Sequence, residues 1–467
     1  MIEYDIVIIG GSLAGRYAAS LAIQLGAKVA LVEPENSSEL LYSSALNHIA
    51  CEYRPQVSKM APSESIDWEI AMLWAFGVES QICAYNELAL IAAQGVDVIV
   101  GSGQFEQKSH LAFFVNNRLL VGRTYLLATG SHYLAPDIEG LHKTGFLTLG
   151  NISFSLENKP NNWVILGGVP QSIELAQAAS RLNCNVTLIV EGSKIISHVD
   201  SEVAQLLEAQ LEASGVRILK ETKVTQVLSI DGKKWLQAGD KAIETDEIIV
   251  ATQTPNIESL NLAAVGVKWH KNRLLVNPKL QTTNNRIYAC GDVIGGYTLT
   301  NLANYEVNIA LRNALFFPTR KVDYQYVPWG IATQPALAHV GITEAQAQQL
   351  YKFDEIIVLR QYFKSLPLAQ INDETTGVCK IITLNNGEIL GASIFGFNAG
   401  ELINLISLAI NRKIKISNFH KIALAYPSVG EIILQAARDW NKIKLDRNNA
   451  LQELLEDFFQ FRRNWNL

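Results

Sequence analysis

A glycine-rich turn near the N-terminus has the residue types that a phosphate-binding loop requires. Residues 10–15 read Gly-Gly-Ser-Leu-Ala-Gly and follow the apolar run 6–9. In a dinucleotide-binding loop the first glycine makes a tight turn, the second lets the backbone approach the pyrophosphate, and the third allows the helix to pack on the strand. Gly10 and Gly15 take the first and third places, and Ser12 takes the second. The serine is a small departure, because its hydroxyl can itself donate to a phosphate oxygen.

The elements around this turn are those that such a site needs. Residues 13–25 carry apolar side chains on one helical face and end at Gly26, and residues 29–32 form a second apolar run. Glu33 follows, roughly 20 residues beyond the loop, where a carboxylate can accept from ribose hydroxyls. The helix N-terminus offers free N–H groups to the negative charge. This order of elements predicts a nucleotide site. A glycine turn without a ligand would not need an acid such as Glu33 at the end of the second strand.

A second unit of the same kind lies further along the chain, but its loop departs more from the pattern. The apolar run 163–166 leads into Gly167 and a helical pattern that contains Glu174. With Glu174 as the reference, the three loop places fall on Gly167, Val169 and Ser172. Val169 puts a β-branched side chain where the backbone should approach a pyrophosphate. We therefore expect this unit either to bind a second nucleotide or to be a structural remnant.

The arrangement of these units predicts the fold class. Two strand–turn–helix–strand units imply an α/β protein with two doubly wound, Rossmann-like nucleotide-binding domains. Between them, residues 100–127 alternate in the manner of antiparallel strands, for example at 111–115 and 123–127. After residue 325 the pattern changes to strand-like segments at 355–359, 378–383 and 389–394, with helices at 400–411 and 430–441, which predicts a third, α+β domain.

Composition excludes several classes of function. The net charge of −6 gives no global attraction to a nucleic-acid backbone. The N-terminus has no basic and apolar leader, and no stretch approaches the ~18 uninterrupted apolar residues of a membrane span, so we expect a cytoplasmic protein. Five scattered cysteines without a C-x-x-C pair indicate neither a zinc site nor a disulfide framework, and no metal site is expected.

Further motifs give the chain a resemblance to a known family. Residues 128–131 read Ala-Thr-Gly-Ser, residues 288–293 read Tyr-Ala-Cys-Gly-Asp-Val, and 333–335 with 338–344 supply Thr-Gln-Pro and Ala-His-Val-Gly-Ile-Thr-Glu. In this order, over roughly residues 4–440, the chain resembles the pyridine nucleotide–disulfide oxidoreductase family, the group of dihydrolipoamide dehydrogenase, glutathione reductase and mercuric reductase.

The resemblance implies FAD as cofactor, a homodimer and a set of FAD-binding residues. Ala128, Thr129 and Gly130 would close the first half of the FAD site, and Gly291 and Asp292 the second, with Asp292 bonded to the ribitol chain. The predicted domains are an FAD-binding domain in two parts (1–155 and 285–325), an NAD(P)-binding-like domain (156–284), a dimerisation domain (326–442) and a C-terminal helical extension (443–467).

The chain departs from the family at the redox-active cysteines. Members of the family usually carry a C-x4-C pair shortly after the first acid, but no cysteine lies between Glu33 and Cys51. Ser44 stands where the resemblance places a lysine near the flavin. Because a dithiol relay needs two thiols in reach of each other, disulfide reductase activity of the usual kind is not expected. Cys51 alone is expected to be a packed cysteine, with a sensor thiol as the alternative.

Two further departures concern the electron donor and acceptor. The position at the strand end of the second unit where an acid is expected is either Val190 or Glu191. If it is Glu191, NADH would be favoured over NADPH. The family's His-Pro-Thr-x-x-Glu appears as residues 426–431, Tyr-Pro-Ser-Val-Gly-Glu. Glu431 remains, but Tyr426 replaces the histidine, and a tyrosine with a pKa near ~10 is a poor base at neutral pH. Tyr426 is expected to serve the acceptor site as a hydrogen-bond donor or stacking group, or else to be a buried interface aromatic.

The last twenty residues predict a separate amphipathic helix. Asn448 can cap it, acids lie in its early turns, and Arg462 and Arg463 lie near its end. Its apolar face is expected to dock on the protein's own surface, or alternatively to contact a membrane periphery or a partner helix.

These observations predict an FAD-dependent oxidoreductase that is not a disulfide reductase. Electrons would pass from NAD(P)H or another donor directly through the flavin to a quinone-like or protein acceptor. The alternative is a non-catalytic or sensory FAD protein with a degenerate NAD(P) site, which acts through a partner.

Overall fold

The computed structural model describes residues 2–34, 42–52, 67–85, 87–107, 110–152, 159–271, 273–296 and 298–465. The chain forms two compact units. Unit 1 comprises residues 1–195 and 211–323, and unit 2 comprises residues 196–210 and 324–467. No helix within the described ranges has both the length and the apolar character needed to cross a membrane.

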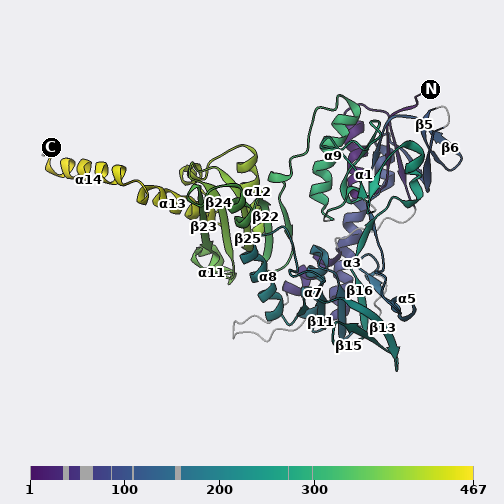
Figure 1. Ribbon diagram of the computed structural model, residues 1–467, viewed down its shortest axis with the longest axis horizontal. Coiled ribbons are helices and arrows are strands. Elements are labelled where there is room, and N and C mark those ends of the chain that lie inside the picture. The colour runs from purple at the N-terminus through teal and green to yellow at the C-terminus, as the bar shows by residue number, and fades with distance from the viewer. Residues whose placement is uncertain are drawn as a thin grey trace. The chain divides into compact units, whose positions relative to one another are not determined.

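The first sheet of unit 1 contains the first glycine turn. Its five strands are parallel and lie in the order β20-β7-β1-β2-β3. Helices α1 (Leu13–Gln24) and α9 (Thr300–Leu315) contact each other on this sheet (Figure 1). The strands are β1 (Tyr4–Ile9), β2 (Val29–Glu33), β3 (Asp97–Val100), β7 (Gly122–Leu127) and β20 (Ile287–Ala289).

The expectation of antiparallel strands throughout 100–127 is wrong for its last segment. β4 (Gly103–Gln107), β5 (Leu111–Val115) and β6 (Arg118–Leu120) form an antiparallel sheet as expected. β7, however, pairs in parallel with β1 at the centre of the first sheet. Its residues Tyr125, Leu126 and Leu127 are all fully buried, because both faces of a doubly wound sheet are covered.

The second sheet of unit 1 contains the second glycine turn. Its strands are parallel, in the order β12-β11-β10-β16-β9. Helix α7 (Pro170–Arg181) follows the turn and packs against α2 (Tyr42–Glu52), which in turn packs against α3 (Trp68–Tyr85). The strands are β9 (Leu147–Thr148), β10 (Asn162–Leu166), β11 (Asn185–Ile189), β12 (Arg217–Leu219) and β16 (Glu247–Val250). A separate antiparallel sheet consists of β13 (Val224–Ile230), β14 (Lys233–Ala238) and β15 (Lys241–Thr245).

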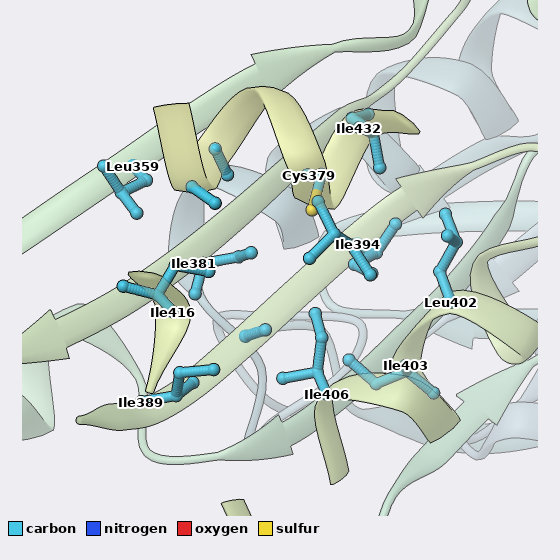
Figure 2. Packing of buried hydrophobic residues seen from close by; sticks show 14 of the residues in the cluster. Leu359, Cys379, Ile381, Ile389, Ile394, Leu402, Ile403, Ile406, Ile416 and Ile432 are labelled. Atoms are coloured by element: carbon cyan, nitrogen blue, oxygen red, sulfur yellow. The ribbon is translucent and has the colours of Figure 1, made fainter. Parts of the chain in front are cut away.

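Unit 2 is built on an antiparallel sheet with helices packed against it. The strand order is β21-β22-β25-β24-β23. Figure 2 shows its core, where Cys379 and Ile381 of β24 and Ile394 of β25 meet Leu402 and Ile406 of α12. The elements are β21 (Trp329–Ile331), β22 (Ala336–Gly341), β23 (Ile356–Tyr362), β24 (Val378–Leu384), β25 (Ile389–Gly396), α12 (Ala399–Asn411) and α13 (Glu431–Asp446). The three strand segments and two helices predicted after residue 325 are confirmed.

Helix α8 and the C-terminal helix complete unit 2. α8 (Ser201–Ala213) begins in this unit, where Asp200 precedes it. α14 (Asn449–Asn464) follows α13, and the side chain of Asn448 caps it by accepting from Leu451 N at 3.1 Å. None of the residues of α14 is buried, so the expected docking on the chain's own surface is not seen.

Candidate nucleotide and flavin site

The first glycine turn has contacts that only glycine permits. Gly10 has φ +111°, and a Cβ there would lie 2.2 Å from the carbonyl oxygen of Ala128. A Cβ on Gly15 would lie 1.9 Å from the carbonyl oxygen of Gly10, so the third glycine of the motif lets α1 approach the turn. A Cβ on Gly11 would lie 2.2 Å from the carboxyl carbon of Glu33. Sequence reasoning assigned no role to Gly11, although the double glycine was visible.

Ser12 is engaged within the loop rather than directed to a ligand. It is the N-cap of α1, and its Oγ accepts from Gly15 N at 3.3 Å. The same hydroxyl donates to the carbonyl oxygen of Ala128 at 2.9 Å. Donation to a phosphate, as expected from the sequence, would therefore require the bond to Ala128 to break. Ser12 instead ties the loop to the end of β7.

Glu33 lies at the end of β2, beside the loop. The register Ile9↔Val32 brings the carboxyl ends of β1 and β2 to one edge of the sheet. Glu33 is buried, and its Oε1 accepts from Arg16 Nη2 at 2.7 Å. Sequence analysis missed Arg16, because no motif marks a partner for this acid. The role of Glu33 toward a ribose stays a prediction.

The segment after β7 joins the same edge. Ala128 N donates to the carbonyl oxygen of Ile9 at 2.8 Å. Thr129 Oγ1 donates to the carbonyl oxygen of Asn256 at 2.7 Å, and Gly130 has φ +67°. These bonds anchor the segment, so its backbone borders the loop.

Asp292 and Gly291 follow β20 at this edge. Burial raises the pKa of Asp292, and hydrogen bonds from Ser131, at 3.0 Å, and from Thr298 partly offset the rise. Gly291 has φ +72°, and its N–H donates to Glu306 Oε2 at 2.6 Å. Glu306 is buried on α9 and was missed, because no spacing rule connects a helix residue to this turn.

The residues present fit a dinucleotide. Ligands of doubly wound sheets bind outside the carboxyl ends of the parallel strands. The carboxyl ends of β1, β2, β7 and β20 converge here, and glycines at 10, 11 and 15 let the loop pack closely against α1, Glu33 and the segment after β7. Gly10, Glu33 and Asp292, brought together from distant parts of unit 1, would hold the cofactor, while Ser12 holds the loop in shape.

The second glycine turn offers fewer free donors. Gly167 has φ +112°, as a first loop glycine requires, and a Cβ on Gly168 would lie 2.4 Å from Ile195 O. Pro170, the first residue of α7, has no N–H. The N–H of Val169 donates to Ser172 Oγ at 3.0 Å, and this hydroxyl donates to Gly167 O at 2.7 Å. The hydroxyl of Ser172 thus bonds to backbone groups of the turn itself.

Two acids near the second glycine turn have different environments. Glu191 is exposed after β11, whereas its neighbour Val190 is buried, so Glu191 is the acid available at this strand end. Glu174 is buried on α7, and its Oε2 accepts from Ser44 Oγ at 2.6 Å. The structure thus brings Ser44 and Glu174 together, and it leaves Glu191 open to solvent.

A chain of polar groups connects the start of α7, after the second loop, to Asp292. Gln171 Nε2, at the start of α7, donates to the carbonyl oxygen of Thr298 at 2.8 Å. Thr298 Oγ1 donates to Gln253 Oε1, and Ser131 Oγ reaches the same Gln253 oxygen at 3.4 Å and Asp292 at 3.0 Å. Of the groups that bond to Asp292, Thr298 is thus also in contact with Gln171 at the start of α7.

Tyr426 and Glu431 belong to unit 2. Tyr426 is 75% exposed within one chain, as a residue of an acceptor site or of a dimer interface would be. Glu431 starts α13, and its Oε1 accepts from Ser428 N at 3.1 Å. Glu431 therefore stabilises the turn that carries Tyr426.

The cysteines with described side chains differ in their exposure. Cys184, Cys290 and Cys379 are buried free cysteines, and Cys83 is half-buried. Burial raises the pKa of Cys184 to about 11 and that of Cys379 to about 12, and it also raises that of Cys290. The side chain of Cys51 lies outside the described residues. Across the described ranges, no cluster of His, Cys, Asp and Glu could hold a metal ion.

Comparisons with known proteins agree with this architecture. The pyridine nucleotide-disulphide oxidoreductase model matches residues 4–307, and the dimerisation-domain model of the same family matches residues 327–437. A mercuric reductase of Staphylococcus aureus is 31% identical over 461 residues, covering 94% of this chain and 83% of that protein. A mitochondrial dihydrolipoyl dehydrogenase of Pisum sativum is 30% identical over 466 residues, covering 93% of this chain and 91% of that protein.

A solved structure shares the fold. The HOCl-induced flavoprotein disulfide reductase RclA from Escherichia coli superposes with a TM-score of 0.82 at 24% identity, covering 93% of this chain and 99% of that chain. Members of the matched family are FAD-binding flavoproteins that use NAD(P)H, and the dimerisation domain indicates a homodimer. The predicted fold class and the predicted FAD cofactor are thereby confirmed. The chain belongs to the pyridine nucleotide–disulphide oxidoreductase family.

Proposed function

We propose that this protein is an FAD-dependent oxidoreductase that passes electrons from NAD(P)H directly through the flavin to a quinone-like or protein acceptor, without a disulfide step. The observation that carries the proposal is a first nucleotide site that fits FAD beside a segment that has no cysteine between Glu33 and Cys51. In a disulfide reductase, two thiols in that segment would relay the electrons.

The described thiols support a mechanism without a dithiol. Because burial raises the pKa of Cys184, Cys290 and Cys379, these groups remain protonated at neutral pH and are poor nucleophiles. Three buried free cysteines also favour a reducing compartment, so we propose a cytoplasmic location.

Bound FAD supplies a two-electron relay between a hydride donor and an acceptor. The loop at residues 10–15 would hold the pyrophosphate at the N-terminus of α1, Glu33 would accept from ribose hydroxyls, and Asp292 would bond to the ribitol chain. In the net reaction with a quinone, NAD(P)H and one proton are consumed, and NAD(P)⁺ and the quinol are formed.

Tyr426 and Glu431 are proposed for the acceptor side. Tyr426 is exposed on its own chain, and its hydroxyl can donate a hydrogen bond to a quinone oxygen or its ring can stack on a planar acceptor. Glu431 would hold the turn that positions Tyr426. Tyr426→Phe is expected to slow quinone turnover while the rate of flavin reduction by the nucleotide stays unchanged. Tyr362→Phe, at another exposed tyrosine of unit 2, is the matched control.

A second candidate is a non-catalytic or sensory FAD protein that acts through a partner. The specific observation in its favour is the second loop, where Pro170 lacks an N–H and Ser172 engages the N–H of Val169. Such a loop offers a pyrophosphate fewer donors than the first one. If weak nucleotide binding is caused by the β-branched side chain, Val169→Gly should accelerate flavin reduction by NADH.

Anaerobic mixing distinguishes the two candidates. The purified flavoprotein is mixed separately with NADH and NADPH, and bleaching of the flavin absorbance is followed. Bleaching within seconds, then reoxidation by a benzoquinone, supports the oxidoreductase. Failure of both nucleotides to reduce the flavin supports the sensory protein and contradicts NAD(P)H as donor.

The thiol part of the proposal has its own test. Lipoamide, glutathione disulfide and Hg²⁺ are offered as acceptors in parallel with the quinone, before and after alkylation of the reduced protein with iodoacetamide. We expect quinone turnover that alkylation leaves unchanged. Turnover of a disulfide that alkylation abolishes would overturn the proposal.

A further inference from the structure

A cavity of about 350 Å³ opens in unit 2, between helix α8 and one face of the antiparallel sheet. Three side chains on neighbouring strands form its floor: Tyr362 of β23 pairs with Val378 of β24, which pairs with Phe395 of β25. Directly opposed residues of antiparallel strands point to the same face of a sheet. Val378 and Phe395 are buried, whereas Tyr362 is 48% exposed on the edge strand. The cavity therefore has an apolar floor that is open at one side.

Ion pairs hold the start of α8 over the same face of the sheet. Two residues along each strand from the floor, Arg360 and Lys380 form the next row. Lys380 Nζ bonds to Asp200 Oδ1 at 2.7 Å, and Arg360 Nε bonds to Glu202 Oε2 at 3.0 Å. α8 therefore begins over this charged row, and it reaches the apolar floor one helical turn later, at Leu206.

The side chains of α8 leave the space above the floor unfilled. Leu206 lines the cavity but is 39% exposed. Ala209, one turn further on the same side of the helix, contributes only a methyl group. A preformed apolar cavity of this kind favours a ligand with an apolar body, because transfer of that body out of water is favourable.

Close backbone contacts fix the wall beside the floor, which is the loop before β24. Gly377 has φ +141°, and a Cβ there would lie 2.2 Å from the carbonyl oxygen of Phe395. Phe363 N donates to the carbonyl oxygen of Gly377 at 3.2 Å. Thr375 and Thr376 line the cavity next to this anchored glycine. Their hydroxyls are thus available as hydrogen-bond donors at the rim.

Lys364 carries the charge of the cavity. Of the described residues that line the cavity, it alone has an ionisable group that is charged at neutral pH. Its Nζ lies 5.6 Å from the centroid of the Tyr362 ring, and within the described ranges it makes no ion pair. The acid that precedes the wall, Glu374, instead accepts from Gln334 Nε2 at 2.6 Å. An ammonium group beside an apolar floor is complementary to a ligand that has one negative charge on an apolar body.

We propose that this cavity binds a planar aromatic carboxylate of about two fused rings. The rings would lie against the row that contains Tyr362 and Phe395, since aromatic side chains favour stacked or edge-on aromatic partners. The carboxylate would meet the ammonium group of Lys364. A volume of 350 Å³ is at the small end of the range for ligand sites, about 300–1,000 Å³. Only the ring of Tyr362 is used, so Tyr362→Phe preserves the site.

This site is separate from the flavin site and does not depend on the proposed electron acceptor. All of its lining residues belong to unit 2, whereas the residues assigned to FAD belong to unit 1.

Three probe ligands test the chemical class. 2-Naphthoate has rings and charge, 2-naphthalenemethanol has nearly the same shape without the charge, and octanoate has the charge without rings. Isothermal titration calorimetry of the flavoprotein should give a Kd of about 1 mM or lower for naphthoate. The Kd of each of the other two should be about fivefold higher or more. Absence of naphthoate binding, or an equal Kd for naphthoate and either comparison ligand, would overturn the proposal.

A lysine variant tests the position of the carboxylate. Lys364→Met should raise the Kd of naphthoate about fivefold and change that of naphthalenemethanol by less than about twofold. Lys442→Met, at an exposed lysine of α13 outside the cavity, is the matched control and should leave both Kd values unchanged. Equal effects of the two variants on naphthoate binding would contradict the role of Lys364.

Filling the cavity tests the location independently of charge. Ala209→Phe places a ring above the floor and should weaken naphthoate binding about tenfold or more, while the flavin content stays that of the wild type. Gln205→Phe adds the same ring at an exposed position of α8 outside the lining, and it should keep the wild-type Kd. Unchanged naphthoate binding in Ala209→Phe would place the ligand elsewhere on the protein and overturn the proposal.

Discussion

The hydroxyl of Ser44 donates a 2.6 Å hydrogen bond to the buried carboxylate of Glu174. One helical turn further, Asn47 Nδ2 donates to Gln177 Oε1 at 3.1 Å. The two bonds connect α2, which follows the first nucleotide-binding unit, to α7, which follows the second glycine turn. The serine that stands where the family resemblance places a lysine therefore still provides a donor at this helix contact, but a neutral one.

Removal of this donor should weaken the contact between the two helices. Ser44→Ala leaves the buried Glu174 without that hydrogen bond and should lower the free energy of unfolding by about 1–3 kcal/mol. Glu174→Gln keeps the shape of the acceptor and should cost less. A double-mutant cycle measured by urea denaturation should give a coupling of at least about 0.5 kcal/mol. Additive effects would show that the bond contributes nothing.

Gly15→Ala should abolish FAD binding. The new Cβ would lie 1.9 Å from the carbonyl oxygen of Gly10, so α1 must move away from the loop that holds the pyrophosphate. The purified variant should contain at least tenfold less flavin per chain, measured by absorbance after denaturation. Gly77→Ala is the control: Gly77 lies within α3 with open space around it, and alanine there should keep full flavin content and gain about 0.5–1 kcal/mol of stability.

Asp292→Asn should increase the stability of the flavin-free protein at neutral pH. Because burial raises the pKa of Asp292, the folded state binds its proton more tightly than the unfolded state does. The free energy of unfolding therefore falls as the pH rises from the ordinary pKa of 3.8 through the raised pKa of Asp292. Asparagine does not titrate, so it removes that loss. Unfolding free energies of both proteins between pH 4 and 7 check the sign. A difference that does not grow with pH would contradict it.

His339 should make unit 2 sensitive to acid. Burial lowers its pKa from 6.5 to about 4, and the neutral ring accepts from Ser393 Oγ at 2.8 Å and donates to Gly341 O at 3.0 Å. Between pH 6.5 and 4 the unfolded state binds the proton and the folded state does not. Stability contributed by His339 is therefore present above pH 6.5 and is lost on acidification, by up to about 3 kcal/mol.

The comparison of two histidine variants isolates this effect. His339→Gln should flatten the pH dependence of the unfolding free energy between pH 6.5 and 4. His420 lies exposed on the same unit, so His420→Gln should leave the slope of the wild type in place. An unchanged slope in His339→Gln would assign the acid sensitivity to other groups.

Lys380→Met should destabilise unit 2 strongly. The ammonium group is buried and bonds to Asp200 at 2.7 Å and to Glu344 at 2.6 Å. The carboxylate of Asp200 is also buried, and removal of its cation costs about 3–5 kcal/mol. Thermal and urea unfolding measure the loss, and the exposed Lys364→Met should stay within about 0.5 kcal/mol of the wild type. Equal stability of both variants would refute the role of this ion cluster.

Local spacing explains why much of the first site could be predicted. A dinucleotide loop requires particular residue types at fixed steps, so Gly10, Ser12, Gly15 and Glu33 could be proposed as its residues from the chain alone. The helices and strands after residue 325 were likewise predicted, because their apolar periodicity is local. The antiparallel assignment of residues 123–127 failed because periodicity in a short apolar run does not specify which strand will be its neighbour.

The sequence by itself determined the two strand–turn–helix–strand units, the family and the absence of cysteines between Glu33 and Cys51, since each of these is a matter of residue type and order. Only the tertiary structure decided that Ser44 meets Glu174, 130 residues away, and that Glu306 receives the N–H of Gly291. Only the structure decided that the hydroxyl of Ser12 is engaged by Ala128. Contacts between segments far apart in the chain leave no local pattern, because they depend on how the sheets bring the strand ends together.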